Sequence, residues 1–569
     1  MKCFLFTLLL FLINRPYTPT IKADYFAAPV KIPMLLAGNF GELRSNHFHS
    51  GIDIKTQGKT GIPVYAPAEG TLSRIKISPW GFGTALYIDH PNGYTTVYGH
   101  LSALRDDLAK YARDLQYRNR SFELDQSVPA GKFRFKQGEL IAYSGNSGSS
   151  GGPHLHFEIR DSKTQNPINP LLFNFAIRDS KAPKLMSVML YPLSKGAHIN
   201  GSSSQKPIDL VMFDGAYHLK SNPTITAGGE IGFGIMGLDY LDGSWSKCGI
   251  YEISLSVNGK LIYNFKLNEI SFSQSRYINS YIDYTYLKNN RRRYQKNWIE
   301  EGNQLNNYLV RENEGKLAIE AGKDYEISYL VKDVYGNTSR LQFTVHGQAP
   351  IAPAASPRGI PVYHATEFKL QQPNVQAIMK AGTFYSDFQL DYKELPSAKD
   401  LFSKRIQLHE PDVPVHQAYK LRIKAESLPD QLKSKALLVA IDPKTGKKSS
   451  MGGQYSNGWV ESQVRQLGTF AIATDTEAPS ITPLNIKNHS SLTDRRKVSF
   501  KIMDDLSGVD SYQGEIDGQW VLFEYDGKNN LIEYYFDETR LQLGKSHQLK
   551  LRVNDGAGNQ STYQAKFYR

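Results

Sequence analysis

The sequence predicts a mainly β chain in which an antiparallel β domain is followed by smaller β modules. Three observations predict this fold class. Apolar and polar residues alternate over 154–159, which is the period of a strand. Beyond about residue 178, short alternating segments are separated by turns rich in glycine and asparagine. Two of those later segments share their opening and closing motifs. A length of 569 residues leads us to expect three or four domains.

The first residues have the pattern of an export signal. Lys2 precedes an apolar run over 4–13 that is too short to span a bilayer and fits the core of a signal peptide. We expect residues 1–23 to be removed, with cleavage after Ala23. Cys3 lies ahead of the apolar run, which is the wrong place for lipoprotein processing. No other stretch could cross a membrane, so we expect an exported chain in the periplasm or at the cell surface, with no transmembrane segment after signal removal.

Two short strings, a hundred residues apart, hold the residue types of a metal site. They offer two imidazoles and a carboxylate as ligands, plus one further histidine. This is the ligand set of a catalytic zinc, which keeps its fourth position open for water. Any one of these residues alone favours a structural role, but their joint occurrence indicates a metal site. The strings are His49-Ser-Gly-Ile-Asp53 and Gly152-Pro-His154-Leu-His156-Phe-Glu158.

The local pattern predicts how these side chains are presented. His154 and His156 project side by side, because residues i and i+2 point to the same face of a strand. The glycine- and serine-rich run over 144–153 predicts a loop at the rim of the domain. In the first string, Gly51 and the alternation over 52–54 favour a loop that runs into a strand, with both ligands turned to one side.

Four motifs occur in a fixed order over about residues 30–175. They are His49-x-Gly-x-Asp53; Gly61-x-Pro-Val64-x-Ala66-x-x-x-Gly70; Gly93-Tyr-x-Thr-x-Tyr98-x-His100-Leu101; and Gly138…Gly145…Gly148…Gly152-Pro-His154-Leu-His156-Phe-Glu-Ile-Arg160. In this order they closely resemble the lysostaphin/LytM-type zinc peptidases.

The resemblance implies a Zn2+ ion bound by His49, Asp53 and His156. It implies that His100 and His154 act on the attacking water and stabilise the tetrahedral intermediate. Such families cleave peptide crosslinks of bacterial peptidoglycan with a small antiparallel β domain of the LytM (duplicated-hybrid-motif) type and an open groove. We therefore expect residues 24–178 to form a peptidase domain.

The sequence departs from the family between His100 and Gly138, where the family usually has a short connection. An insert over about 104–128 carries apolar residues at 104, 108, 111 and 115, which is helical spacing. We expect a helix there that could line or roof the groove.

The chemistry can also be argued without the family. Zinc lowers the pKa of a bound water to about 7, but a side chain must still move the proton. The sequence has no H-E-x-x-H motif, so the glutamate base of other common zinc peptidases is missing. His100 and His154 have to fill that role, and histidine titrates in the right range.

Other nearby side chains have competing interpretations. His47 could compete as a ligand, but the register of Gly51 with Asp53 favours His49 and leaves His47 beside the groove. His90 lies at a hairpin turn marked by Asn-Gly, which indicates a structural role.

Cysteine content and net charge say little about the function of the chain. Cys3 leaves with the signal, so Cys248 is alone and is predicted to be a small buried hydrophobe, with intermolecular pairing as the alternative. The formal charge of +12 suggests attraction to an anionic surface such as peptidoglycan, although lipopolysaccharide or nucleic acid would fit the charge equally. The arginine triplet at 291–293 is predicted to be a solvated loop, and we expect no nucleic-acid partner.

The later chain contains an internal repeat. It suggests immunoglobulin-like β-sandwich modules over 179–346 and 476–569, the first with an extended loop over 281–307. Residues 347–475 are predicted to be a linker followed by a β-rich module. The repeat motifs are Lys181-Ala-Pro183 and Glu477-Ala-Pro479 at the start, and Asp333-Val-Tyr-Gly-Asn337 and Asp555-Gly-Ala-Gly-Asn559 near the end.

We expect the modules to hold no second set of acids or metal ligands and to act as scaffolds. Binding of wall glycan or a protein partner through them is left open. For the whole chain we expect an exported zinc metalloendopeptidase that hydrolyses peptidoglycan crosslinks. The alternatives are a non-hydrolytic wall-binding regulator of other hydrolases, and a peptidase acting on proteins. Regulators of this family usually lack a zinc ligand, whereas all three ligands and both assisting histidines occur here.

Overall fold

The structure is a computed structural model that describes residues 24–352 and 359–569. The predicted signal peptide and part of the predicted linker lie outside these residues. Strands hold 46% of the chain and helices 8%, which confirms the mainly β fold class. Within the described residues, no helix combines the length and apolarity needed to span a membrane. We name the bodies by the predicted divisions: N-terminal domain (24–178), second module (179–346), third module (359–475) and C-terminal module (476–569).

The N-terminal domain is built on a nine-stranded antiparallel sheet that surrounds one apolar core. The strand β11 lies in its middle, paired with β2 on one side and β6 on the other. The sheet contains β1 (Leu36–Gly38), β2 (Ile52–Lys55), β4 (Gly70–Ile77), β5 (Thr84–Asp89), β6 (Tyr94–Leu101), β8 (Leu124–Ser127), β9 (Arg134–Phe135), β11 (His154–Asp161) and β12 (Pro167–Ile168). A second sheet contains β3 (Pro63–Tyr65), β7 (Ala103–Leu104) and β10 (Leu140–Tyr143).

The predicted helical insert is confirmed as α1 (Asp106–Asn119). Leu108, Ala112 and Leu115 are its buried face, at the i, i+4, i+7 spacing of a helix packed on one side. At its C-terminal end Tyr117 packs edge-on against Trp520 of the C-terminal module, with ring centroids 5.2 Å apart. The helix therefore joins two bodies of the molecule. It also lines a cavity of about 520 Å³ that the loop 146–148 and the C-terminal module share.

The second module differs from the expected two-sheet sandwich. Its twelve strands form one continuous sheet, and the extra pairing of β17 with β24 closes β13, β15, β16, β17 and β24 into a ring of strands. The strands are β13 (Lys184–Pro192), β14 (His198–Ile199), β15 (Lys206–Phe213), β16 (Ala216–Leu219), β17 (Thr226–Leu238), β18 (Glu252–Val257), β19 (Lys260–Lys266), β20 (Gln295–Lys296), β21 (Tyr308–Arg311), β22 (Leu317–Ile319), β23 (Asp324–Lys332) and β24 (Thr338–Gly347).

The predicted extended loop over 281–307 is wrong. The segment carries the end of α2 (Ile278–Tyr281), then α3 (Tyr284–Asn290) and β20. Asp283 begins α3 by accepting a hydrogen bond from the backbone N–H of Tyr286, which is an N-cap. Both helices are too short to leave a visible period in the sequence.

The last two modules each have their own core. The third module contains β25 (Ile360–Val362), β26 (Phe368–Gln372), β27 (Val375–Met379), β28 (Phe388–Leu390), β29 (Tyr392–Leu395), β30 (Arg405–Leu408), β31 (Tyr419–Lys424), β32 (Ala436–Ile441), β33 (Lys448–Ser450), β34 (Gln454–Ser456), β35 (Trp459–Val464) and β36 (Gly468–Thr474). The C-terminal module contains β37 (Ser480–Pro483), β38 (Ser490–Ser491), β39 (Lys497–Met503), β40 (Val509–Ile516), β41 (Gln519–Val521), β42 (Phe523–Asp526), β43 (Leu531–Tyr535), β44 (Ser546–Asp555) and β45 (Gln560–Tyr568). The third module has two five-stranded sheets and a two-stranded sheet of β25 and β28, whereas the C-terminal module has two sheets.

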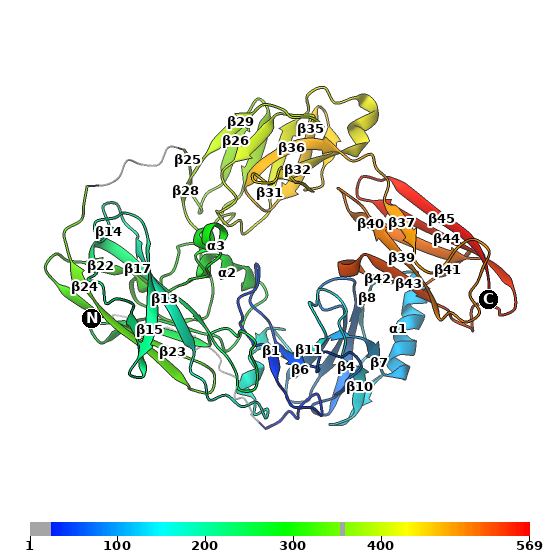
Figure 1. Ribbon diagram of the computed structural model, residues 1–569, viewed down its shortest axis with the longest axis horizontal. Coiled ribbons are helices and arrows are strands. Elements are labelled where there is room, and N and C mark those ends of the chain that lie inside the picture. The colour runs from blue at the N-terminus through cyan, green and yellow to red at the C-terminus, as the bar shows by residue number, and fades with distance from the viewer. Residues whose placement is uncertain (1–23, 353–358) are drawn as a thin grey trace, which may run out of the picture.

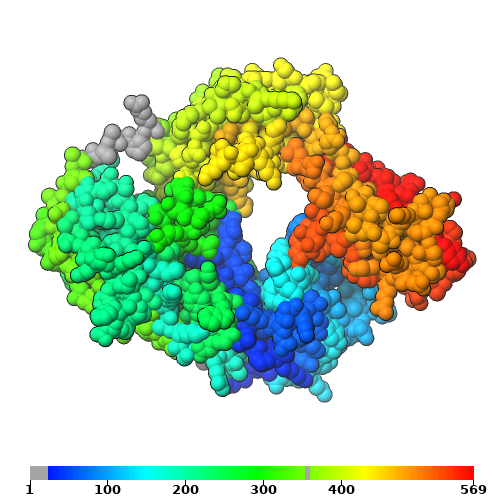
Figure 2. Space-filling model, viewed as in Figure 1, coloured from blue at the N-terminus to red at the C-terminus, as the bar shows by residue number. Residues whose placement is uncertain are grey.

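The four bodies close into a ring (Figure 1). The space-filling view shows an opening through its middle (Figure 2). The C-terminal module returns to the N-terminal domain, where Trp80 packs edge-on against Tyr525 with ring centroids 6.3 Å apart. Beside this contact, Lys528 donates a hydrogen bond from Nζ to the backbone oxygen of Asn146. The ring is therefore closed by side chains next to the loops 78–83 and 144–153.

Candidate metal centre and active site

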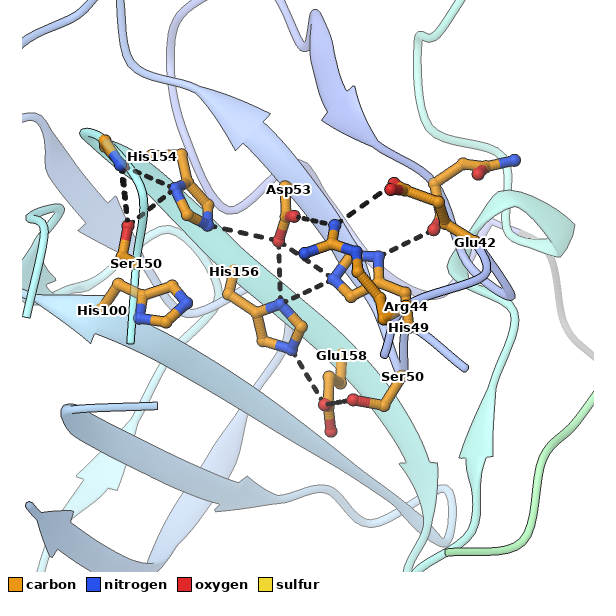
Figure 3. Close-up of polar contacts among 12 residues, drawn as sticks. Glu42, Arg44, His49, Ser50, Asp53, His100, Ser150, His154, His156 and Glu158 are labelled. Carbon is orange, nitrogen blue, oxygen red and sulfur yellow. Dashed lines mark hydrogen bonds and ion pairs between the residues drawn. The ribbon is translucent and has the colours of Figure 1, made fainter. Parts of the chain in front are cut away.

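The five predicted site residues lie together in the N-terminal domain (Figure 3). Asp53 is on β2, His154 and His156 are on β11, His49 is in the loop before β2, and His100 is near the end of β6. The backbone pairing places His156 directly opposite Asp53. The predicted strand at 154–159 and the predicted loop running into a strand at 49–55 are both confirmed.

Gly51 is needed where the first string passes β11. A Cβ atom at this position would lie 2.4 Å from the backbone oxygen of Phe157, closer than any real contact. The loop can therefore lie flat against β11 only with a glycine there. This close approach brings His49 and Asp53 to the same side of the sheet as His156.

Three atoms form a compact triangle that could hold a metal ion. His49 Nε2 lies 3.1 Å from His156 Nδ1 and 3.1 Å from Asp53 Oδ1, and His156 Nδ1 lies 2.9 Å from Asp53 Oδ1. Ligands about 2.0–2.1 Å from a tetrahedral zinc are separated by about 3.3 Å, so the triangle is close to one face of such a tetrahedron. All three side chains are buried.

The outer ring nitrogens of both histidines are held by the protein. His49 Nδ1 lies 2.7 Å from the backbone oxygen of Asn39, which can only accept, so Nδ1 carries the proton and Nε2 is free for a metal. His156 Nε2 lies 2.9 Å from Glu158 Oε1, which leaves Nδ1 facing the triangle. Such outer hydrogen bonds fix the tautomer of a metal-binding imidazole and raise its basicity.

Glu158 is a buried anion behind His156. Its carboxylate also accepts hydrogen bonds from Ser50 Oγ and from Arg160 Nε, the latter at 2.5 Å. Burial alone would raise the pKa of Glu158, but the charge of Arg160 and the His156 hydrogen bond lower it to about 2. Burial would likewise lower the pKa of His156, but its hydrogen bonds to Asp53 and Glu158 raise it to about 9. The carboxylates of Asp53 and Glu158 therefore favour positive charge on His156.

The second oxygen of Asp53 is held by an arginine. Arg44 donates a hydrogen bond from Nη2 to Asp53 Oδ2 at 2.8 Å, so Oδ1 alone faces the triangle. Burial by itself would raise the pKa of Asp53. The charge of His49 and hydrogen bonds from His154 and His156 outweigh burial and hold it well below its usual range. Asp53 is thus an anion at neutral pH, as a metal ligand must be.

The two predicted assisting histidines lie at the edge of the triangle. His154 Nε2 is 3.3 Å from Asp53 Oδ1, while its Nδ1 bonds the backbone oxygen of Gly152 at 2.8 Å. His100 Nδ1 bonds the backbone oxygen of Ser147 at 2.8 Å, and its ring centroid is 4.7 Å from that of His154. His100 therefore keeps its Nε2 for a reacting molecule, whereas the Nε2 of His154 lies beside Asp53 Oδ1.

His100 adopts a left-handed backbone conformation, with a φ of 60°. This conformation costs of order 1–3 kcal/mol for a non-glycine residue and is concentrated at functional sites. Burial, followed by the charges of His156 and His154, lowers the pKa of His100 to about 3. The imidazole of His100 is therefore neutral at neutral pH.

The competing side chains lie elsewhere or serve the fold. His47 is exposed, bonds the backbone oxygen of Ser45 through Nδ1, and contributes no atom to the triangle. His90 is buried, with its two ring nitrogens bonded to the backbone oxygen of Glu69 and to Thr96 Oγ1. Its predicted structural role fits these contacts. Cys248 is buried in the core of the N-terminal domain, as predicted.

Sequence reasoning gave no role to Asn39, Arg44 or Glu158. Glu158 could have been found, because the alternation that places His154 and His156 on one face places Glu158 there too. Asn39 and Arg44 lie in an irregular loop, where no periodic signal exists. The position of Asn39 also depends on its contact with Gly249 of the second module, which spacing along the chain does not reveal.

The antiparallel β domain thus carries a histidine–aspartate–histidine triangle that could hold a metal ion, and a comparison with known families gives its class. Residues 47–112 and 118–170 match the family described as peptidase family M23, which confirms the resemblance to LytM-type peptidases for the N-terminal domain. Residues 361–475 match the family described as Zu5-like domain. This match covers almost all of the β-rich third module.

The curated relatives match this chain over 121 to 139 residues. An uncharacterized metalloprotease of Haemophilus influenzae is 35% identical over 121 residues, which are 21% of this chain and 20% of that protein. The DD-carboxypeptidase/endopeptidase Mpg of Neisseria meningitidis is 34% identical over 129 residues, 23% of each chain. The peptidoglycan DD-endopeptidase ShyA of Vibrio cholerae is 28% identical over 139 residues, 24% of this chain and 26% of that protein. The match spans only about a fifth to a quarter of these relatives.

Among solved structures, the catalytic domain of the prophage-encoded M23 protein EnpA from Enterococcus faecalis is 26% identical. It covers 26% of this chain and 95% of that chain, with a TM-score of 0.19. The catalytic domain of lysostaphin from Staphylococcus simulans is 22% identical, over 23% of this chain and 86% of that chain, with a TM-score of 0.17. Because these scores are below 0.5, the solved structures add nothing to the sequence match.

Proposed function

We propose that the chain is an exported zinc metalloendopeptidase that hydrolyses peptide crosslinks of bacterial peptidoglycan. The observation that carries this proposal is the triangle of His49, Asp53 and His156 atoms, with the imidazoles of His100 and His154 beside it. Relatives named as a DD-carboxypeptidase/endopeptidase and a peptidoglycan DD-endopeptidase support the substrate class. The formal charge of +12 suits an anionic polymer that carries carboxylates.

The donor set fits zinc. Two imidazole nitrogens and one carboxylate oxygen are typical of catalytic zinc sites, and the outer hydrogen bonds to Asn39 and Glu158 are the supports that such ligands need. His49, Asp53 and His156 would hold the ion. When bound, zinc would lower the pKa of water to about 7 and polarise the scissile carbonyl.

His100 and His154 supply the proton transfers. Neutral His100, with its Nδ1–H donated to Ser147, offers Nε2 to accept a proton from the attacking water. His154 is fixed in the same way by Gly152, and its Nε2 lies on the same side of β11. Once protonated, either imidazole can donate a hydrogen bond to the developing oxyanion or protonate the departing amine.

The test compares His49→Ala with His47→Ala in the full mature chain. The two histidines share one loop, but only His49 touches the triangle. We expect His49→Ala to lose bound zinc, from about one ion per chain to none, together with the release of muropeptides from purified peptidoglycan. His47→Ala should retain both. Wall cleavage that survives His49→Ala, or a zinc-loaded wild type that releases no muropeptides, would contradict the proposal.

A further inference from the structure

Two clusters of aspartates lie outside the active site, one in the second module and one in the C-terminal module. Asp179, Asp239 and Asp333 form the first cluster, and Asp475, Asp504 and Asp555 form the second. In each cluster, one carboxylate oxygen from every residue lies within 4.8 Å of the others. The expectation that the modules carry no convergent set of acids is therefore wrong.

The two clusters are built from the same three motifs in the same order. The first aspartate begins D-x-x-A-P ahead of the first strand of its module, the second begins D-x-L-x-G directly after β17 or β39, and the third begins D-x-x-G-N in the turn before the last strand. The motifs are Asp179-Ser-Lys-Ala-Pro183, Asp239-Tyr-Leu-Asp-Gly243 and Asp333-Val-Tyr-Gly-Asn337, then Asp475-Thr-Glu-Ala-Pro479, Asp504-Asp-Leu-Ser-Gly508 and Asp555-Gly-Ala-Gly-Asn559.

One asparagine forms hydrogen bonds with two aspartates of the first cluster. Asn337 donates from its backbone N–H to Asp333 Oδ1 at 2.9 Å and from Nδ2 to Asp333 Oδ2 at 2.6 Å. The same Nδ2 donates to the backbone oxygen of Asp179 at 3.1 Å. These bonds hold two aspartates from opposite ends of the module beside each other.

The second cluster repeats every one of these bonds. Asn559 donates from its backbone N–H and from Nδ2 to the two carboxylate oxygens of Asp555, both at 2.7 Å. Its Nδ2 also reaches the backbone oxygen of Asp475 at 3.0 Å. Two modules with different sheet topologies thus keep the same acidic arrangement, which a solvated turn would not require.

A buried oxygen in the first cluster lacks a partner. Asp239 is 3% exposed, and its Oδ1 is buried with no hydrogen-bond partner among the described residues. A void of about 10 Å³, about the space of one water or ion, lies between Asp239, Asp179 and the loop residues Asn39 and Phe40. Lys181, the nearby cation, is turned to Asp242 at 3.9 Å and to the backbone oxygen of Leu241.

Three carboxylates at this spacing repel one another. Burial, followed by the charges of Asp179 and Asp333, raises the pKa of Asp239 to about 7. A buried, unpartnered carboxylate is costly unless a cation compensates it. Ligands that are all oxygen are those of a hard cation, whereas zinc prefers nitrogen and sulfur.

We propose that each aspartate cluster is a calcium site. Calcium accepts six to eight oxygen ligands in flexible geometry, so carboxylates from three separate segments together with backbone oxygens and water suit it better than magnesium, which demands a near-ideal octahedron. Each ion would tie the start of its module to the turn before the last strand. Since both sites lie where the chain enters a module, both would stiffen the ring.

The first site is connected to the metal centre by a short path. Asp239 and Cys248 exchange two backbone hydrogen bonds of 2.9 Å, and the next residue, Gly249, is bonded to the side chain of Asn39. The backbone oxygen of Asn39 in turn accepts the hydrogen bond from His49. Calcium at Asp239 would therefore hold the loop that orients His49, which makes the first site a positioning site for the zinc ligand.

The test measures calcium binding by titration calorimetry on the zinc-loaded full chain in calcium-free buffer. We expect two calcium ions per wild-type chain, with affinity in the range of about 0.1–1 mM typical of extracellular modules. Asp239→Asn and Asp504→Asn should each reduce the stoichiometry from two to one. The matched controls are Asp242→Asn and Asp505→Asn, which remove the neighbouring acids and should leave two sites. Calcium should raise the melting temperature of the wild type by several degrees and that of each cluster variant by less.

These readouts do not depend on peptidase activity, so the proposal can fail while the proposed function stands. It is overturned if the wild type takes up no calcium at about 1 mM, the weak end of the range for extracellular modules, or if magnesium binds in preference to calcium. It is also overturned if Asp239→Asn raises the melting temperature in calcium-free buffer while calcium leaves the melting temperature of the wild type unchanged. That result would mean that the carboxylates are neutralised by protons alone.

Discussion

Asn39 and Gly249, which are 210 residues apart, hold each other through two hydrogen bonds. Asn39 Nδ2 donates to the backbone oxygen of Gly249 at 2.9 Å, and the backbone N–H of Gly249 donates to Asn39 Oδ1 at 2.7 Å. Because the backbone oxygen of Asn39 also accepts the Nδ1–H of His49, the second module fixes a zinc-ligand histidine of the proposed site. A contact from the second module thus supports the proposed metal site through Asn39.

We predict that Asn39→Ala weakens zinc binding by about 10- to 100-fold, the usual cost of losing the support of a ligand imidazole. The variant keeps the backbone oxygen but releases it from Gly249, so His49 loses its orientation. Competition with a zinc chelator measures the effect. Asn46→Ala, which removes a contact with Asn279 in the same interface, serves as the control. Equal zinc affinity in both variants would argue against a role for the Asn39–Gly249 pair.

Glu158→Gln should destabilise the N-terminal domain by about 3–5 kcal/mol, because it leaves the buried Arg160 without its anion. Urea unfolding measures the loss. Asp125→Asn removes the partner of Arg74 in an exposed ion pair, and its cost should be about 0–1 kcal/mol. If the two variants cost the same, the buried pair is not a structural anchor.

His100→Gln should lower kcat/KM for wall cleavage by about 100- to 10,000-fold while zinc content stays at one ion per chain. The change removes a proton acceptor but no atom of the triangle. Zinc analysis and muropeptide release on the same preparation separate the two effects. Loss of zinc in this variant would show that His100 acts on the metal and not on the proton.

Acid should weaken the fold through His90. Burial lowers the pKa of His90 below its ordinary value. On acidification, the unfolded chain therefore binds a proton at His90 at a pH where the folded chain does not. The stability due to neutral His90 is present above pH 6.5 and is lost as the pH falls below it, by at most about 1.4 kcal/mol per pH unit. His90→Gln should flatten this part of the stability curve between pH 7 and about pH 5. His218→Gln, at an exposed position of the second module, should leave the curve unchanged.

Trp80→Ala should open the ring between the N-terminal domain and the C-terminal module. The indole packs against Tyr525 and beside Gly527, where an added Cβ would lie 2.4 Å from it. Small-angle scattering should show a larger radius of gyration for the variant. Trp245→Ala, which removes an indole that is 93% exposed, should leave the radius unchanged. Equal radii for both variants would indicate that Trp80 does not hold the junction.

Local patterns predicted the strand carrying His154 and His156, the loop-to-strand passage through Gly51 and the helix α1, because each depends on a period or a glycine that the sequence displays. The same patterns could not predict α2 and α3, which are too short to show a period. Each aspartate of the two clusters looks like an ordinary turn residue, since what joins them is contact across a module. The position of Asn39 was hidden for the same reason.

The closed ring has a consequence for how the Trp80–Tyr525 junction responds to its surroundings. Both partners belong to one chain, so each meets the other at an effective concentration of about millimolar or above. A pairing too weak to detect between separate molecules would still keep the ring shut. Soluble fragments at low concentration would fail to displace it, whereas a dense polymer that presents many neighbouring sites could. We expect a competing ligand to open the junction only where its local concentration reaches about millimolar or above.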